Sequence, residues 1–264
     1  MANPGGNYPG RQIFLGSLIT GEDAFAYFGS GRSAASQARY ATNFIPGENS
    51  VRIKPTSPDE KFDPFRHYQA VRIDPESGLA VISNSQAPVD ALVEAYKFIP
   101  EWEGWAATSE EWYTGAENFA EILLHLIGPE YDNRLKPTSR VVGIIRPLEI
   151  GTVYIIGNTS HLNTSRAISF QPESGEFRWV STYDGEVDYS NFDPSKLGDT
   201  HFATAARSAR ELTNEIYNAS DYVDPKYGEL RVWCVAGVRN GNGPGGWEIA
   251  RRNRRKDPDS RSDL

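Results

Sequence analysis

A short segment rich in glycine and serine contains the first residues with the chemistry to bind a ligand. Residues 29–33 read Gly-Ser-Gly-Arg-Ser, and Arg39 follows Arg32 at a short distance. Glycine exposes backbone N–H groups, and hydroxyl and guanidinium groups add donors, so this composition suits a phosphate monoester. The alternative is a surface turn with solvated arginines, because glycine and serine are common in turns. The segment is not a P-loop, since the closing Gly-Lys-Ser/Thr is missing. Its candidate binding residues are Ser30, Arg32, Ser33 and Arg39.

A second candidate site lies where a strand runs into polar residues. The apolar pattern and the turn residues between 68–74 and 79–83 predict a hairpin. Its second strand opens into Ser-Asn-Ser-Gln from Ser83, and we expect a helix from Pro88. Hydroxyls and amides at such a place can hold an anion or a polar ring. The alternative is an ordinary capped helix entry. Ser83 and Asn84 are the candidate contacts.

The histidines and the cysteine point away from a metal centre. The four histidines, His67, His125, His161 and His201, are not paired at the spacing of zinc ligands. The one cysteine, Cys234, lies in an apolar strand pattern, which is typical of a buried structural thiol rather than a nucleophile. We therefore expect neither a metal nor a cofactor.

Composition bounds the partners and the compartment. The chain has 264 residues and a net charge of −8, and an acidic body argues against nucleic acid as the main partner. No run approaches the ~18 consecutive apolar residues of a membrane-spanning helix. The first residues lack the basic and apolar regions of a signal peptide, so we expect a cytoplasmic protein with no membrane contact.

The pattern of the chain predicts one large domain between two flexible ends. We expect a flexible N-terminus at 1–10, a single domain at 11–240 and a flexible basic tail at 241–264. Many hairpins and few helices favour an α+β layered sandwich. Helices are expected at 88–97, 113–127 and 200–218. Strands are expected at 12–19, 24–28, 50–54, 68–74, 79–83, 140–147, 152–157, 166–171, 176–181 and 230–238.

Four ordered segments between residues 11 and 185 resemble the archaeal-type IMP cyclohydrolase family. The first combines Ile13-Phe14-Leu15-Gly16 and Phe25-Ala26-Tyr27 with the Gly-Ser-Gly-Arg-Ser segment. The second combines Asp63-Pro64-Phe65, Tyr68 and Arg72-Ile73 with Ile82-Ser83-Asn84-Ser85. The third is Tyr131-Asp132 followed by Ser139-Arg140-Val141-Val142-Gly143-Ile144-Ile145, and the fourth is Ser181-Thr182-Tyr183-Asp184.

The resemblance implies a fold and a reaction. The fold would be a four-layer αββα sandwich, like that of N-terminal-nucleophile hydrolases but without the nucleophile. The substrate would be a ribonucleotide monophosphate, formamidoimidazole-carboxamide ribonucleotide. The enzyme would close its second ring, with loss of water, to give inosine monophosphate (IMP), the last step of purine biosynthesis. The family also implies a homo-oligomer.

The family pattern also implies roles for individual residues. Tyr68 would act as an acid or hydrogen-bond donor to the formyl oxygen. Asp132 would be the carboxylate, with Glu130 as its substitute because the family more often has Glu here. Arg32 would be catalytic, sharing phosphate or oxyanion stabilisation with Arg39 and Ser33. Ser30, Ser83, Asn84 and Arg140 complete the set of substrate contacts. His67 matches nothing in the pattern and receives no role.

Two other functions remain open from the sequence. The first is a purine-nucleotide-binding protein on the same scaffold that is non-catalytic or acts differently. The second is a protein–protein module that uses Trp102, Trp105 and Trp112 as an aromatic surface. Loss of association after polar substitution of these tryptophans would indicate the second.

Overall fold

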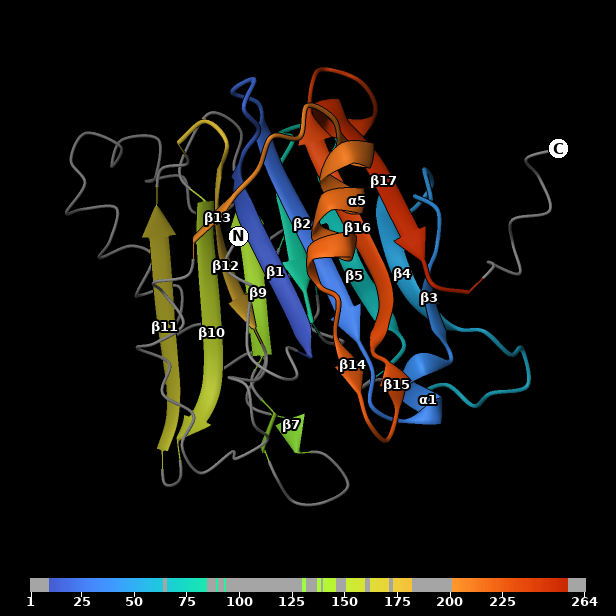
Figure 1. Ribbon diagram of the computed structural model, residues 1–264. Coiled ribbons are helices and arrows are strands. Elements are labelled where there is room, and N and C mark those ends of the chain that lie inside the picture. The colour runs from blue at the N-terminus through green and yellow to red at the C-terminus, as the bar shows by residue number, and fades with distance from the viewer. Residues whose placement is uncertain are drawn as a thin grey trace, which may run out of the picture.

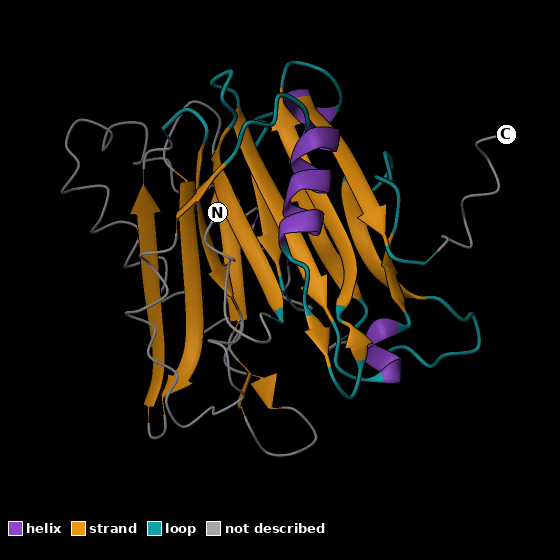
Figure 2. Cartoon of the chain, in the orientation of Figure 1, coloured by secondary structure: helices purple, strands orange, loops and turns teal. Residues whose placement is uncertain are grey.

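The computed structural model describes residues 10–63, 66–84, 173–181 and 201–255. Between these stretches it also describes residues 89, 93, 130–131, 137–138, 140–145, 151–159 and 162–170, mostly as backbone. Within this part of the chain the fold is mixed, with mostly antiparallel strands and few helices (Figure 2). This agrees with the α+β class that the hairpin pattern favours.

Six antiparallel strands form the first sheet, in the order β13-β12-β1-β2-β16-β17. Three of its inner strands, β1, β2 and β16, are apolar on both faces, and nearly all of their residues are buried. Strands of this kind are covered by other layers on each side. The bounds are β1 Arg11–Ser17, β2 Asp23–Ser30, β12 Glu176–Ser181, β13 His201–Ala203, β16 Arg231–Arg239 and β17 Trp247–Asn253.

Seven antiparallel strands form the second sheet, in the order β11-β10-β9-β6-β5-β4-β3. The predicted hairpin is confirmed: β5 and β6 pair with Ile73 opposite Ala80, and Asp74 accepts hydrogen bonds from Ser77 in the turn. The bounds are β3 Arg39–Ala41, β4 Ser50–Pro55, β5 Tyr68–Ile73, β6 Ala80–Ser83, β9 Arg140–Ile145, β10 Gly151–Thr159 and β11 Leu162–Phe170.

The two sheets pack face to face, and helix α5 (Ala209–Ala219) covers the outer face of the first sheet (Figure 1). One apolar core lies between the sheets and includes Ile13, Tyr27 and Tyr68. A second core lies under α5 and includes Phe14, Leu212 and Cys234. Alternate residues of β1 therefore serve different cores, as the strand period of two requires.

The shorter elements lie at the ends of the sheets. Helix α1 (Ala34–Gln37) follows β2, and a 3₁₀ helix, η3 (Pro244–Gly246), lies in the turn between β16 and β17. Two small ribbons pair β7 (Glu130–Tyr131) with β8 (Pro137–Thr138) and β14 (Val223–Asp224) with β15 (Gly228–Glu229). No helix in the described part of the chain is long and apolar enough to cross a membrane.

The helix predicted at 200–218 is wrong in its first half. Residues 201–203 form β13, where Phe202 is buried and packs edge-on against Phe14 at a centroid distance of 5.7 Å. The helix begins only after Ser208, whose side chain accepts a hydrogen bond from the Glu211 N–H. Pairing at the edge of the first sheet therefore decided the structure of residues 201–203, although the alanines of this segment are spaced as in a helix.

The flexible tail predicted at 241–264 is wrong over residues 247–253, because β17 pairs along its whole length with β16. The glycine-rich turn before it is anchored as well. Gly245 adopts φ +57° and lies so close to the β5–β6 turn that a Cβ there would be 2.7 Å from the Asp74 carbonyl. The Trp247 indole N–H donates to the Gly78 carbonyl at 2.6 Å. The glycines thus permit a close contact between turns of the two sheets.

Two other expected helices fall mainly outside the described residues. Val89 and Val93 are helical and buried, in agreement with a helix from Pro88. The rest of that helix, the helix at 113–127, the three tryptophans Trp102, Trp105 and Trp112, and residues 1–9 and 256–264 lie outside them.

Candidate functional site

The topology brings the ends of several candidate segments to one end of the sandwich. In the second sheet β5 begins at Tyr68, β6 ends at Ser83 and β9 begins at Arg140, and Ser83 pairs with Val142. In the first sheet β2 ends at Ser30. Because these strands are antiparallel neighbours within their sheets, residues far apart in the sequence share this end.

A hydrogen bond between two buried tyrosines connects the sheets at this end. The hydroxyl oxygens of Tyr27 in β2 and Tyr68 in β5 are 2.6 Å apart, and the two residues are 0% and 2% exposed. Burial raises the pKa of Tyr27 well above its usual value, and the neighbouring Tyr68 raises it further. Tyr27 therefore stays protonated throughout the physiological pH range.

Positive charge and an indole surround the tyrosine pair. The Arg11 guanidinium carbon lies 5.4 Å from the centre of the Tyr68 ring. Trp233 packs edge-on against Tyr27 with ring centroids 4.6 Å apart. Its buried indole N–H has no hydrogen-bond partner among the residues that the structure describes. The inter-sheet core at this end thus contains polar groups as well as apolar ones.

Arg39 is buried beside this group, which is rare for an arginine and requires hydrogen bonds. It begins β3 and is 2% exposed. Its Nε donates to the Ser36 carbonyl at 2.7 Å and one Nη to the Ser30 carbonyl at 3.3 Å. Its charge lowers the pKa of Tyr27 in opposition to the larger effect of burial. Arg39 therefore fixes the end of β2 and supplies positive potential to the cluster.

The glycine-rich segment does not present the backbone donors that we expected for a phosphate. The N–H groups of Ser30 and Gly31 donate to the carbonyls of Gly10 and Leu230. The Ser33 N–H donates to the Ser36 hydroxyl, and the Ser33 hydroxyl caps α1. These backbone groups are already paired because the segment continues a strand and then enters a capped turn.

The side chains of the same segment lie in different surroundings. Ser30 is buried, and its hydroxyl donates to the Gly10 carbonyl at 2.8 Å. Arg32 is half-buried, and Ser33 is exposed. Gly29 has a packing role, because a Cβ there would lie 2.3 Å from the Trp233 ring. The structure thus groups Arg39 with Tyr27, and Ser33 lies on the surface.

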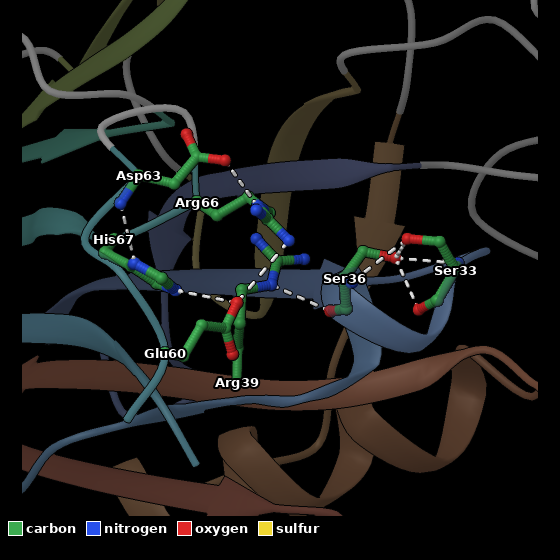
Figure 3. A network of polar contacts seen from close by, with 7 residues as sticks. All are labelled: Ser33, Ser36, Arg39, Glu60, Asp63, Arg66 and His67. Atoms are coloured by element: carbon green, nitrogen blue, oxygen red, sulfur yellow. Dashed lines mark hydrogen bonds and ion pairs between the residues drawn. The ribbon is translucent and has the colours of Figure 1, made fainter. Parts of the chain in front are cut away.

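A polar network surrounds His67, the residue that directly precedes Tyr68 (Figure 3). His67 is 2% exposed, and its Nδ1 accepts a hydrogen bond from the Asp63 N–H at 3.0 Å. The neutral ring therefore has its hydrogen on Nε2, which is 3.8 Å from a Glu60 carboxylate oxygen. Arg66 contacts Glu60 at 3.5 Å and Asp63 at 2.6 Å.

Burial lowers the pKa of His67, and the charges around it act in both directions. Glu60 and Asp63 raise this pKa, whereas Arg66 and Arg39 lower it. The neutral imidazole is therefore the favoured form at neutral pH. Figure 3 shows this network and the α1 cap on either side of Arg39.

The other predicted residues divide into two groups. Ser83, the last residue of β6, and Asn84, which follows it, are 0% and 1% exposed. Asp132 lies outside the described residues, and Arg140 is described only as the first backbone residue of β9. Glu130 is likewise described only as backbone of β7. The carboxylate role therefore stays a prediction.

Sequence reasoning missed five residues of this cluster: Arg11, Tyr27, Glu60, His67 and Trp233. Tyr27 belongs to the first segment that resembles the family, but the pattern indicated only a strand residue there. Its hydrogen-bond partner, Tyr68, follows from the tertiary structure alone. His67 precedes Tyr68 directly, which is the one local signal available. Within the described residues no group of three or more His, Cys, Asp and Glu side chains is placed to hold a metal. The expectation of no cofactor stays a prediction.

Comparison of the chain with models of known protein families gives no match, and comparison with curated proteins gives none.

The cluster has the chemistry of a proton donor in a positive environment. A phenol hydroxyl at a strand end, next to two guanidinium groups and little exposed to water, can donate to an oxygen that gains negative charge. The one cysteine of the chain is not part of this cluster, because Cys234 lies in the other core, where burial raises the pKa of its thiol.

Proposed function

We propose that this protein is an IMP cyclohydrolase, which closes the second ring of formamidoimidazole-carboxamide ribonucleotide. The observation that carries the proposal is the buried pair of Tyr27 and Tyr68 hydroxyls between the sheets, with Arg11 against the Tyr68 ring and the charge of Arg39 acting on Tyr27. The second support is the resemblance of the ordered segments around Tyr27, Tyr68 and Ser83 to the IMP cyclohydrolase family. The finer fold description, a four-layer αββα sandwich like that of N-terminal-nucleophile hydrolases, belongs to it as well. The two facing sheets and α5 supply three of those layers.

The reaction requires orientation and proton transfer rather than a cofactor. The carboxamide nitrogen bonds to the formyl carbon, and the formyl oxygen takes up a proton to become a hydroxyl. This carbon–oxygen bond then breaks, and the oxygen leaves as water, while the two ring-forming nitrogens each give up one proton. Holding the two groups in contact can contribute about 7–11 kcal/mol, so most of the acceleration can come from binding geometry.

The described residues take the following roles in the proposal. Tyr68 donates its hydroxyl hydrogen to the formyl oxygen. Arg39 and Arg11 supply positive potential where that oxygen gains charge. Arg32 is half-buried next to α1 and remains the proposed phosphate contact. Asn84, at the end of β6, orients the imidazole carboxamide. Ser33 is a weaker candidate than the sequence indicated, since its hydroxyl caps α1.

The proposal is tested by following purine absorbance during incubation with the formylated ribonucleotide. Turnover by the wild type is expected, together with a loss of at least about 100-fold in kcat for Tyr68→Phe, because a general acid commonly contributes that much. Tyr217→Phe is the matched control. It removes the hydroxyl of a buried tyrosine in the outer core and should leave kcat unchanged.

Two results would contradict the cyclohydrolase assignment. Equal turnover by wild type and Tyr68→Phe would remove Tyr68 from the chemistry. Absence of turnover with tight binding of IMP would favour the alternative of a nucleotide-binding protein on the same scaffold. The cytoplasmic location and the homo-oligomer are part of the proposal, and sedimentation of the purified protein tests the latter.

A further inference from the structure

The tyrosine pair leaves one hydroxyl hydrogen for another acceptor. Tyr27 and Tyr68 contribute two hydroxyl hydrogens to a single 2.6 Å contact, and either oxygen can be the donor in that contact. One hydrogen is therefore not used between them. Which tyrosine donates decides where this second hydrogen lies.

The surroundings of Tyr27 favour it as the donor. It lies inside β2, fully buried, with Trp233 packed against its ring. Among the residues that the structure describes, Tyr68 is the one hydrogen-bond partner of its hydroxyl. If Tyr27 only accepted, its own hydrogen would stay unpaired inside the core, which costs about 1–3 kcal/mol. Burial also raises the pKa of Tyr27, so the hydrogen stays on its oxygen.

Tyr68 lies at a strand end, whereas Tyr27 lies inside its strand. Tyr68 is the first residue of β5, at the end of the sheet where β6 finishes with Ser83. Arg11 lies against its ring. If Tyr27 donates, the Tyr68 hydrogen turns away from Tyr27 and is left for another acceptor at this end of the sandwich.

We propose that Tyr27 is a positioning residue for ring closure: it donates to the Tyr68 hydroxyl oxygen and thereby directs the Tyr68 hydrogen at the formyl oxygen of the substrate. This inference rests on the proposed function. In the step, the carbon–nitrogen bond forms as Tyr68 gives its proton to the formyl oxygen. The proton that the carboxamide nitrogen loses then returns to Tyr68. Tyr27 keeps its own proton throughout.

The donated hydrogen bond has a second effect on the same step. While Tyr68 lacks its proton, the hydrogen bond from Tyr27 stabilises the negative oxygen that remains. A donor hydroxyl whose oxygen accepts a hydrogen bond is also a stronger donor itself. Both effects depend on one oxygen atom of Tyr27, and Tyr27→Phe removes that atom while keeping the ring that packs on Trp233.

The test compares Tyr27→Phe, Tyr68→Phe, the double variant and the control Tyr217→Phe. We expect Tyr27→Phe to lower kcat about 10-fold with KM changed less than about twofold, since an interaction made in the transition state is lost. The double variant should be no slower than Tyr68→Phe alone, since the two residues act as one unit.

The possible failures are distinguishable. Wild-type turnover with an unchanged kcat for Tyr27→Phe would overturn the positioning role and leave the proposed function standing. A loss of kcat that Tyr217→Phe shares would also overturn it, because a general structural effect would then explain the change. A wild type without turnover would overturn the proposed function itself, and the positioning role with it.

Discussion

The Asn253 side chain pairs with the backbone of Ala41 as a neighbouring strand would. Its Oδ1 accepts from the Ala41 N–H and its Nδ2 donates to the Ala41 carbonyl, both at 2.9 Å. Asn253 ends β17 and Ala41 ends β3, and these are edge strands of different sheets. One carboxamide therefore joins the two sheets along this side and satisfies backbone groups that an edge strand otherwise leaves open.

Replacing Asn253 should weaken the fold measurably. Asn253→Ala removes both hydrogen bonds and leaves the part-buried Ala41 N–H without its acceptor, so we expect a loss of about 1–3 kcal/mol in the free energy of unfolding. Urea titration measures this. Asn242→Ala, in the exposed turn before β17, is the control and should change stability by less than about 0.5 kcal/mol. Equal effects of the two variants would contradict the role of Asn253.

A pair of glycine variants tests why residue 29 is glycine. In Gly29→Ala the new Cβ would lie 2.3 Å from the Trp233 ring, so the indole must move, and we expect destabilisation of about 1–3 kcal/mol or more. Gly47→Ala meets no atom within 4 Å and should be neutral or slightly stabilising. Thermal unfolding of both variants gives the answer. A fully stable Gly29→Ala protein would show that the Trp233 contact does not explain this glycine.

The buried His67 should make the fold sensitive to acid. Its pKa is lowered in the folded chain, mainly by burial, whereas an unfolded histidine titrates near ~6.5. Between the lowered pKa of the folded chain and ~6.5, the unfolded chain binds more protons than the folded one. The free energy of unfolding therefore falls as the pH drops below ~6.5, and the histidine has no effect on it above that pH. Urea unfolding at several pH values measures the slope.

Two variants isolate the contribution of His67 to that slope. His67→Gln should make the free energy of unfolding less dependent on pH in the acidic range. His201→Gln is the control, because its side chain is 53% exposed. If the acid sensitivity is the same in His67→Gln and the wild type, another group is responsible.

Cys234 should be protected from thiol reagents in the folded protein. It is 0% exposed under α5, and burial raises the pKa of its thiol, so almost no thiolate forms near neutral pH. We expect a disulfide reagent to modify it at least about 100-fold more slowly in buffer than in urea, because reaction requires opening of this core. Ser57→Cys places a second thiol on an exposed loop as an internal reference. Equal rates for the two thiols in buffer would contradict the packing of α5.

The local pattern of the chain was sufficient for most of the strands. Alternation and turn residues predicted the β5–β6 hairpin because both signals arise within a few residues, where side-chain period and backbone conformation are coupled directly. The same reasoning placed β1, β2, β12 and β16 to within a few residues. It missed β3, β13 and β17, which pair at the edges of the two sheets.

The same distinction between local signals and contacts of distant segments applies to the candidate site. The sequence by itself determined that Tyr68, Ser83 and Asn84 lie at strand ends, because strand boundaries are local. Only the tertiary structure decided that Tyr68 meets Tyr27 across the sheets and that Arg39 is buried next to them. Tertiary structure also gave Ser30, Gly31 and Ser33 structural roles, since their backbone donors pair with the Gly10 carbonyl, the Leu230 carbonyl and the Ser36 hydroxyl of the α1 cap. Residue types limit the available chemistry, but hydrogen-bond partners depend on which sheet faces which, and that is fixed by burial of the whole chain.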